Sequence, residues 1–203
     1  MPAPAASDLP AFPAPLLGRR VLVRPYTVDD APAIREAVDE TREALLRWMP
    51  WGDDHRTIEQ SVAFCSRACE GFHQRTDFIV GIFEREVGRF LGGSGLHVKD
   101  RAARAFELGY WIRASAEGRG YVAETARLVT AAAFESMGAE RVMVCCDPEN
   151  ERSLRVIERL GFPYEGTMLR TQRRRDGGLR DTRVHAMVRE DYERAKARWA
   201  SER

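Results

Sequence analysis

Apolar and polar residues alternate along some stretches of the chain and recur every three to four positions along others. Alternation in the segment 106–112, FELGYWI, predicts a strand, and apolar residues at helical spacing from Tyr121 onward predict a helix soon after it. The same criteria predict strands over residues 19–27, 76–84, 89–99, 141–146, 164–171 and 181–188, and helices over about 30–46, 57–73, 121–136, 149–160 and 190–203.

Short turns between consecutive strands set the expected fold class. Turn residues at 85–88 and 100–103 join three strands, and Asp-Gly-Gly at 176–178 joins the last two, which favours antiparallel neighbours. The pattern predicts one α/β (α+β) domain with a mixed, mostly antiparallel sheet of about seven strands, flanked by helices. We assign this domain to residues 16–203, and a flexible tail rich in Ala and Pro to residues 1–15.

Composition narrows the function classes. The chain has 203 residues and a formal net charge of +1, from 32 basic and 31 acidic residues, so overall charge gives no argument for nucleic acid. No apolar run reaches the length of a membrane span, and the N-terminus lacks the basic start and apolar core of a signal peptide, so we expect a cytoplasmic protein. The four cysteines are too few for a disulfide framework, and we interpret them as packing residues: Cys65, Cys69, Cys145 and Cys146.

The segment between the strand at 106–112 and the following helix contains Gly118 and Gly120. Glycines let a backbone approach a ligand closely, and the unpaired N–H groups and dipole of a helix N-terminus attract negative charge. The segment therefore predicts an anion cradle that suits a pyrophosphate. The alternative is an ordinary turn before a helix. Neither a Walker loop nor a complete dinucleotide-binding fingerprint is present.

Three motifs together resemble the GCN5-related N-acetyltransferase (GNAT) superfamily, and within it the RimJ/RimL-like branch of ribosomal-protein N-acetyltransferases. They are ELGYWI at 107–112, GRGYVAE at 118–124, and NERS at 150–153 followed by RLGF at 159–162. The resemblance covers about residues 17–189. It implies an enzyme that transfers acetyl from acetyl-CoA to a primary amine by direct attack in a ternary complex, without a metal, in a sheet splayed between the strands at 106–112 and 141–146.

The resemblance also implies roles for individual residues. Glu107 is the candidate that deprotonates the amine, and Ser153 the candidate that protonates the CoA sulfur; the alternatives are a backbone contact for Glu107 and a helix cap for Ser153. Glu117 departs from the Gln or Arg of the family pattern, and a carboxylate there would repel phosphate unless it points away. The residues expected to bind CoA are Trp111, Ile112, Gly118, Arg119, Gly120, Tyr121, Val122 and Asn150, where Val122 replaces a usual Gly or Ala.

The acceptor side is expected at Trp48, Met49 and Trp51, for which plain core packing is the alternative. The acceptor would be a protein N-terminal α-amine, a small amine or an amine-bearing toxin. A catalytically silent CoA-sensing module, or an RNA-associated protein that uses a basic cluster, are alternatives from other classes. The resemblance also allows a homodimer. The sequence favours a solvated hairpin for the basic cluster over binding to an acidic substrate, RNA or a CoA phosphate, because no aromatic residues are interleaved with its arginines, which are Arg170, Arg173, Arg174, Arg175, Arg180 and Arg183.

Overall fold

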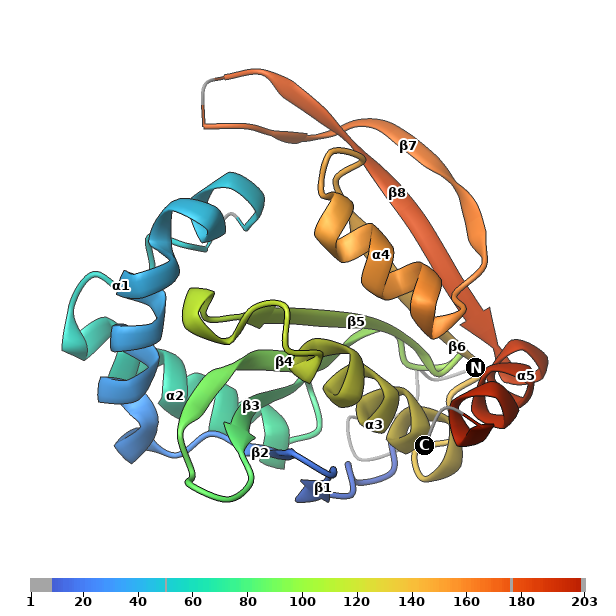
Figure 1. The fold of residues 1–203 in the computed structure, drawn as a ribbon, viewed down its shortest axis with the longest axis horizontal. Coiled ribbons are helices and arrows are strands. Elements are labelled where there is room, and N and C mark those ends of the chain that lie inside the picture. Colours follow the sequence, from blue (N-terminus) through green and yellow to red (C-terminus); the bar gives the residue numbers. More distant parts are fainter. Residues whose placement is uncertain (1–8, 50, 176, 202–203) are drawn as a thin grey trace.

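A computed structural model describes residues 9–49, 51–175 and 177–201. Its elements follow the predicted order (Figure 1). They are β1 (Leu16–Leu17), β2 (Val21–Pro25), the short 3-10 helix η2 (Val28–Asp30), α1 (Ala31–Trp48), α2 (Ile58–His73), β3 (Phe78–Glu84), β4 (Phe90–Asp100), β5 (Ala105–Ile112), the 3-10 helix η3 (Ala114–Ala116), α3 (Tyr121–Glu135), β6 (Arg141–Cys146), α4 (Glu151–Leu160), β7 (Tyr164–Arg173), β8 (Leu179–Val188) and α5 (Arg189–Ser201).

The sheet has eight strands in the order β1-β2-β3-β4-β5-β6-β8-β7. Every neighbouring pair is antiparallel except β5 and β6, which confirms the predicted mixed, mostly antiparallel sheet. The strand beyond the seven expected is β1, in which Leu16 pairs with Val23. A two-residue strand carries no hydrophobic period, so the sequence pattern does not reveal it.

The sheet opens between β5 and β6, as predicted. These strands pair only where residues 105–107 lie beside residues 141–143. Beyond that point β5 continues to Ile112 alongside β4, whereas β6 continues to Cys146 alongside β8. The two halves of the sheet therefore diverge, and the residues on both sides of the opening become available to a ligand.

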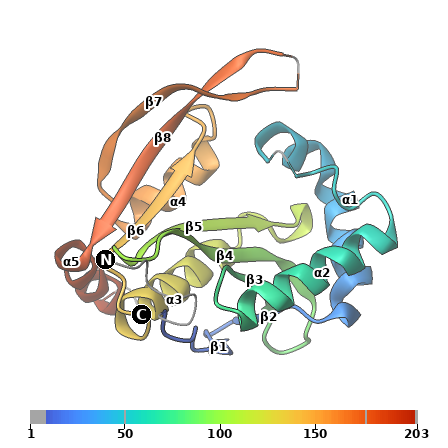
Figure 2. The same ribbon diagram turned by 180° about the vertical axis from the view of Figure 1, so that it is seen from behind.

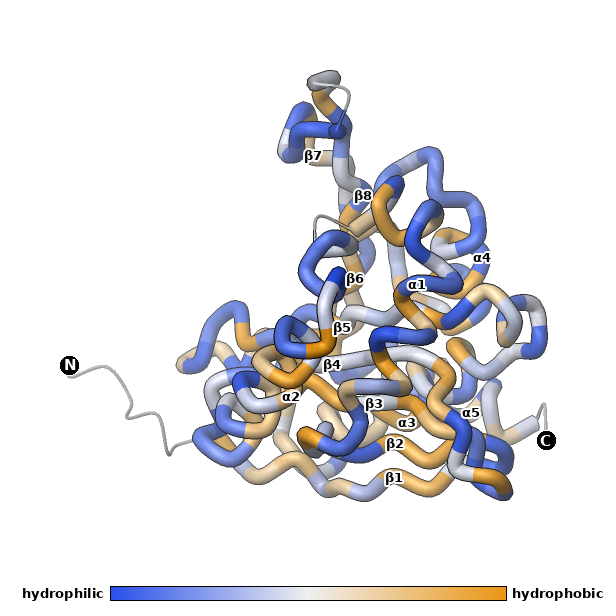
Figure 3. Tube along the Cα trace, turned by 90° about the vertical axis from the view of Figure 1, so that its left-hand side faces the viewer, coloured by the Kyte–Doolittle hydropathy of each residue, from blue (hydrophilic) through white to orange (hydrophobic). Residues whose placement is uncertain are grey.

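Helices cover both faces of the sheet (Figures 1 and 2). On one face, α1 and α2 build a core in which Ile34, Val38 and the free thiol of Cys65 are buried. On the other, α3, α4 and α5 build a larger core, and the ring of Phe134 stacks on Tyr192 with centroids 4.8 Å apart. Hydrophobic segments gather at β2, β3 and α3 in Figure 3. The described helices include none with the length and apolarity that a membrane crossing requires.

The N-terminal segment corrects one prediction. Leu9 and Phe12 are buried in the core, and the Phe12 ring lies 5.8 Å from that of Phe72 and 6.1 Å from that of Phe78. The expected tail over residues 1–15 is therefore wrong for residues 9–15, which belong to the packed domain. Two isolated large apolar side chains among Ala and Pro give no period, although their burial is enough to order the segment. Residues 1–8 lie outside the described part of the chain.

Candidate active site

A cavity of about 400 Å³ lies at the opening between β5 and β6 and extends under the end of α1. Leu108 and Tyr110 of β5 line it from one side of the opening, and Val144 and Cys145 of β6 from the other. It brings together seven of the predicted site residues, which come from both halves of the chain: Trp48, Met49, Trp51, Glu107, Trp111, Asn150 and Ser153.

The floor of the cavity is a trough on β4 and β5. Trp111 lies opposite Gly93 at one end and Glu107 lies opposite His97 at the other, with Gly109 between them on β5. Residues directly opposite in an antiparallel pair project from the same face of the sheet, so these side chains share the face covered by α1 and α2. Because Gly109 has no side chain, the floor stays open between the Trp111 indole and the His97 and Glu107 pair.

The glycines of β4 permit close packing. A Cβ atom at Gly93 would lie 2.5 Å from Trp111 Nε1 and 2.7 Å from the hydroxyl of Tyr26. The register between β3 and β4 also shifts beside these glycines, between Ile82 and Phe83. Gly93 therefore fixes Trp111 against the sheet as one end wall of the trough.

Two ion pairs occupy the other end. Lys99 Nζ lies 2.9 Å from Glu107 Oε2, and the hydrogen bond raises the pKa of Lys99. His97 Nδ1 lies 3.0 Å from each carboxylate oxygen of Asp77, and this hydrogen bond raises the pKa of His97. The candidate base Glu107 is thus half-buried, reaches the cavity and is already paired with a cation.

Ser153 lies at the opening of the sheet, in the first turn of α4. Asn150 begins this helix as its N-cap, and its Oδ1 accepts a hydrogen bond of 3.1 Å from the Ser153 N–H. The Ser153 hydroxyl lies 3.0 Å from the hydroxyl of Tyr110, whose pKa is raised by burial. A neutral phenol therefore lies behind the serine hydroxyl as its hydrogen-bond partner. Tyr110, which is not among the predicted site residues, is part of this arrangement.

The predicted cradle lies beyond the end of β5, outside the lining of this cavity. Gly118 and Gly120 have φ values of +73° and +79°, a left-handed conformation that disfavours residues with a Cβ atom. A Cβ at Gly118 would meet nothing within 4 Å, so the backbone there is open to a ligand. Together with the N–H groups of the first turn of α3, this geometry suits an anion.

Neighbouring side chains leave the cradle unobstructed. Glu117 forms an ion pair with Arg152 on the first turn of α4, so its charge is balanced. The Tyr121 side chain is buried and its hydroxyl donates to Glu84 at 2.8 Å, which leaves its backbone N–H as the group on the cradle side. Arg20 donates to the carbonyl of Arg119 at 2.8 Å. Ile112 and Val122, the remaining residues expected at CoA, are half-buried on either side of this loop.

A buried arginine fixes the loop between β5 and the cradle to α1. Arg113 is 5% exposed, and its guanidinium donates to Glu36 and Glu40 while its N–H bonds to the carbonyl of Leu91 at 2.7 Å. Partial burial acts to raise the pKa of Glu40, but the hydrogen bonds from Arg113 and Ser115 outweigh it and lower that pKa to about 2. The pair therefore stays ionised at neutral pH and holds the cradle in place.

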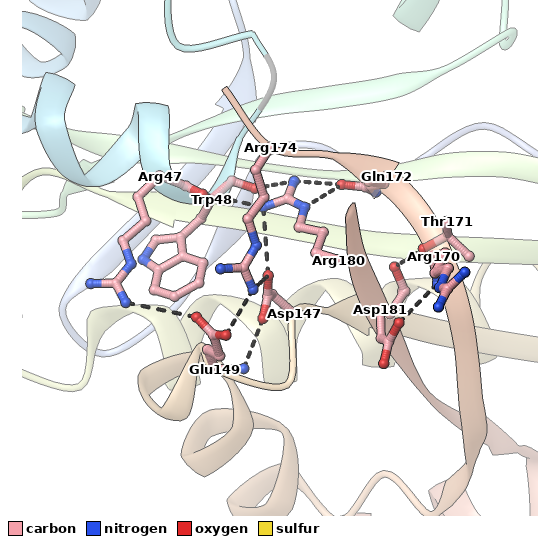
Figure 4. Close-up of polar contacts among 11 residues, drawn as sticks. Arg47, Trp48, Asp147, Glu149, Arg170, Thr171, Gln172, Arg174, Arg180 and Asp181 are labelled. Atoms are coloured by element: carbon pink, nitrogen blue, oxygen red, sulfur yellow. Dashed lines mark hydrogen bonds and ion pairs between the residues drawn. The ribbon is translucent and has the colours of Figure 1, made fainter. Parts of the chain in front are cut away.

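The residues predicted to form the acceptor wall begin where α1 ends. Met49 has extended backbone angles, as expected before a proline, so the chain turns there and places Trp51 against Trp111 with ring centroids 5.7 Å apart. Arg180 on β8 reaches the end of α1, and its Nη1 and Nη2 each lie 3.2 Å from a carbonyl oxygen, of Arg47 and Trp48 respectively (Figure 4). Pro50 lies outside the described residues.

Three arginines of the basic cluster on the β7–β8 hairpin form ion pairs with other parts of the chain. Arg180 is 8% exposed and lies 3.8 Å from Asp147, and Arg174 contacts both Asp147 and Glu149 (Figure 4). Arg175 pairs with Asp53 at 2.8 Å. The hairpin is therefore joined by ion pairs to the loops that border the cavity. His185 on β8 is buried, with Nδ1 3.4 Å from the carbonyl oxygen of Phe162.

Sequence reasoning missed His97, His55 and Asp147, all of which line the cavity. The register between β4 and β5 shifts between Val98 and Asp100, and only this irregularity places His97 opposite Glu107, so the turn at 100–103 gives no signal for His97. His55 and Asp147 reach the cavity only through packing between distant segments, which the sequence does not reveal. In the described residues, no group of three or more His, Cys, Asp or Glu side chains could hold a metal ion.

The model of the acetyltransferase (GNAT) domain family matches residues 20–163, the segment that contains the cradle, the opening of the sheet and Ser153. The chain belongs to this family. It is an acetyl-CoA-dependent N-acetyltransferase, as the sequence motifs predict, and relatives named as a putative ribosomal N-acetyltransferase and as RimJ support the predicted resemblance to the RimJ/RimL-like branch.

Two curated relatives from Bacillus subtilis (strain 168) match this acetyltransferase over most of their length. The probable N-acetyltransferase YjcK is 30% identical over 181 residues, which cover 88% of this chain and 99% of YjcK. The putative ribosomal N-acetyltransferase YdaF is 26% identical over 192 residues, or 92% and 97% of the two chains. Among solved structures, Mycobacterium smegmatis RimJ in complex with CoA-disulfide shares the fold with a TM-score of 0.81 at 24% identity, over 93% of this chain and 96% of RimJ.

Proposed function

We propose that this enzyme acetylates a primary amine in the cavity between β5 and β6, by direct attack in a ternary complex, and that a protein N-terminal α-amine is its acceptor. The observation that carries the proposal is the arrangement of the cavity. A hydroxyl pair stands at the opening of the sheet, a carboxylate and a histidine stand at the far end of the trough, and an aromatic wall lies above them.

The described residues fit acetyl-CoA, which when bound supplies an activated acetyl group as a thioester. Gly118 offers open backbone before α3 for the pyrophosphate, and at Gly120 a Cβ would lie 3.3 Å from Arg20 Nη2, a guanidinium that suits the same anion. The divergence of β5 from β6 leaves backbone groups of residues 108–112 free of a partner on that side for the pantetheine arm. Asn150 and Ser153 border the same opening. Arg152, by pairing with Glu117, removes the repulsion expected from a carboxylate beside a phosphate.

Ser153 and Tyr110 are assigned to the sulfur end of the reaction. Burial raises the pKa of Tyr110 and keeps the phenol neutral, so the hydrogen-bonded hydroxyl pair can relay a proton to a departing thiolate without Tyr110 itself becoming ionised. Glu107 and its neighbours are assigned to the amine end, where the incoming group is an ammonium ion that must lose a proton before it can attack.

The thiols in the cavity are poor nucleophiles. Burial raises the pKa of both Cys145 and Cys146 to about 11, so at neutral pH almost none of either side chain is thiolate. An acyl-cysteine intermediate would need that thiolate. The cavity chemistry therefore favours direct attack by the amine.

The protein N-terminus is proposed as acceptor because the likeness to YdaF, named as a putative ribosomal N-acetyltransferase, covers nearly the whole chain. A small amine is the second candidate, favoured by the aromatic lining of Tyr26, Trp48, Trp51 and Phe64, which would hold a compact apolar body. The ion-paired state of Arg174, Arg175 and Arg180 weighs against an RNA-associated role. A homodimer stays a prediction.

The test is thiol release from acetyl-CoA against a panel of short peptides with varied N-termini, polyamines, aminoglycosides and amino-acid derivatives. Release that depends on the first residue of a peptide supports the N-terminal acceptor and makes Trp48 and Trp51 the residues to vary next. Release with small amines alone assigns the same chemistry to a small substrate. If CoA binds but no amine causes thiol release, the result supports a catalytically silent CoA-sensing module and contradicts the proposed enzyme.

A further inference from the structure

We propose that His97, held by Asp77, is the group that takes the proton from the acceptor ammonium, in place of Glu107. This inference rests on the proposed function, because it names the base for that same reaction. It concerns a residue that the sequence motifs do not single out and that lies on β4, the strand next to the one that carries Glu107.

The first support is the orientation of the imidazole. Nδ1 lies 3.0 Å from both carboxylate oxygens of Asp77, so this nitrogen carries the proton of the neutral ring and Nε2 keeps its lone pair. A Cβ atom at Gly109 would lie 3.3 Å from His97 Nε2. The free nitrogen therefore lies over the one position of the trough where β5 has no side chain, and 44% of the His97 side chain is exposed.

The second support is the state of Glu107. Its Oε2 lies 2.9 Å from the ammonium group of Lys99, so the carboxylate already interacts with a cation. A base is most effective when its lone pair is available to the proton that it removes. Glu107 is better placed to attract the acceptor ammonium into the trough and to stabilise the positive charge that His97 acquires.

The proton step balances as follows. One N–H bond of the acceptor ammonium breaks as an Nε2–H bond forms on His97, and the nitrogen keeps the electron pair with which it attacks the carbonyl carbon. The imidazolium is stabilised by Asp77 and gives its proton to water after the product leaves. The second proton lost by the nitrogen goes to the thiolate, through Ser153 and Tyr110.

The charged groups around His97 fix the expected pH dependence. The hydrogen bond from Asp77 raises the pKa of His97 most; burial and Lys99 act to lower it, and Glu107 acts to raise it. His97 accepts a proton only when neutral, so kcat should rise with pH through this raised pKa. Replacing Asp77 by Asn removes the largest raising influence, so the rise in kcat should move to lower pH.

The test compares His97→Gln and Asp77→Asn with the matched control His73→Gln, an exposed histidine at the end of α2. For each protein, kcat is measured against pH with two acceptors whose own amine pKa values differ. We expect His97→Gln to lower kcat by about 10²–10⁴-fold and to abolish the rise, Asp77→Asn to move it to lower pH, and the control to behave as wild type. A rise that persists in His97→Gln, or that follows the pKa of the acceptor, would overturn the proposal.

A second readout does not need turnover. Titration of the four imidazoles by NMR, in wild-type protein without substrate, should give His97 a pKa above the ordinary value, and Asp77→Asn should lower it. An unshifted His97 would contradict the Asp77 pairing on which the proposal depends. A wild-type protein that releases no thiol with any amine would overturn the proposed function as well, whereas an active His97→Gln with an unchanged pH profile overturns the assignment of His97 alone.

Discussion

Arg180 Nη2 lies 3.2 Å from the carbonyl oxygen of Trp48, so β8 supports the end of α1, from which the acceptor wall begins (Figure 4). The same guanidinium lies 3.8 Å from Asp147, which follows β6 and lines the cavity. One buried side chain thus connects the acceptor wall to the strand that borders the opening of the sheet. The two walls of the cavity are held at a fixed separation by this contact.

Replacing Arg180 by Met should therefore affect both stability and acceptor binding. The substitution leaves the buried Asp147 with Arg174 as its cation and leaves two carbonyls without this donor, and buried acceptors that lose their donor cost roughly 1–3 kcal/mol of unfolding free energy. We expect that loss in chemical denaturation, together with a higher KM for the acceptor and little change in CoA affinity. Arg173→Met, at an exposed position of the same hairpin, is the control. An unchanged acceptor KM would show that Trp48 does not depend on this contact.

Gly118→Ala tests the cradle, and Gly88→Ala is its matched control. Both glycines have positive φ, +73° and +69°, and a Cβ at either would meet nothing within 4 Å, so each variant carries similar strain of roughly 1–2 kcal/mol. Only Gly118 lies at the start of α3. Calorimetry should therefore find CoA binding weakened about tenfold in Gly118→Ala and unaltered in Gly88→Ala, a difference of ~1.4 kcal/mol. Equal affinities would place the pyrophosphate elsewhere.

The proposed proton path from Tyr110 to Ser153 predicts non-additive variants. Tyr110→Phe and Ser153→Ala should each lower kcat, because either change interrupts the hydroxyl pair. If the two hydroxyls act as one unit, the kcat of the double variant should be only slightly below that of the less active single variant. Steady-state kinetics of all four proteins measures this. Fully additive losses would mean that the two hydroxyls act independently.

Glu107→Gln should lower kcat less than His97→Gln and leave CoA affinity almost unchanged. The amide keeps the shape of the side chain but loses the charge that faces Lys99 and the incoming ammonium. We expect roughly a tenfold effect, at the low end of what general acid–base groups contribute, and a higher KM for the acceptor. A large fall in CoA affinity would instead assign Glu107 a structural role.

The local pattern of apolar and polar residues was sufficient to predict most elements of the fold. The alternation in residues 106–112 and the helical spacing from Tyr121 are properties of the chain itself, and the structure places β5 and α3 there. Gly161 closes α4 with φ +85°, as its position after an apolar helix predicts. The opening between β5 and β6 came from family resemblance, because no local property of either strand determines how far they pair.

The candidate site was predicted only where it follows the motifs. Glu107, Ser153 and Trp51 lie in one cavity as expected, whereas His97 and Arg180 were not assigned to it. Their roles depend on contacts across strands or between segments far apart in the sequence, such as the 133 positions that separate Arg180 from Arg47. From the sequence alone, an arginine-rich hairpin is predicted to be solvent-exposed, because its acidic partners lie on other elements.

The most direct test of direct acetyl transfer is the initial-velocity pattern with both substrates varied, using the amine that gives the fastest thiol release. Attack within a ternary complex predicts double-reciprocal lines that intersect, and intact-mass analysis should find the protein unmodified after incubation with acetyl-CoA alone. Parallel lines, together with a protein that gains one acetyl group before any amine is added, would show a covalent enzyme intermediate and contradict the account.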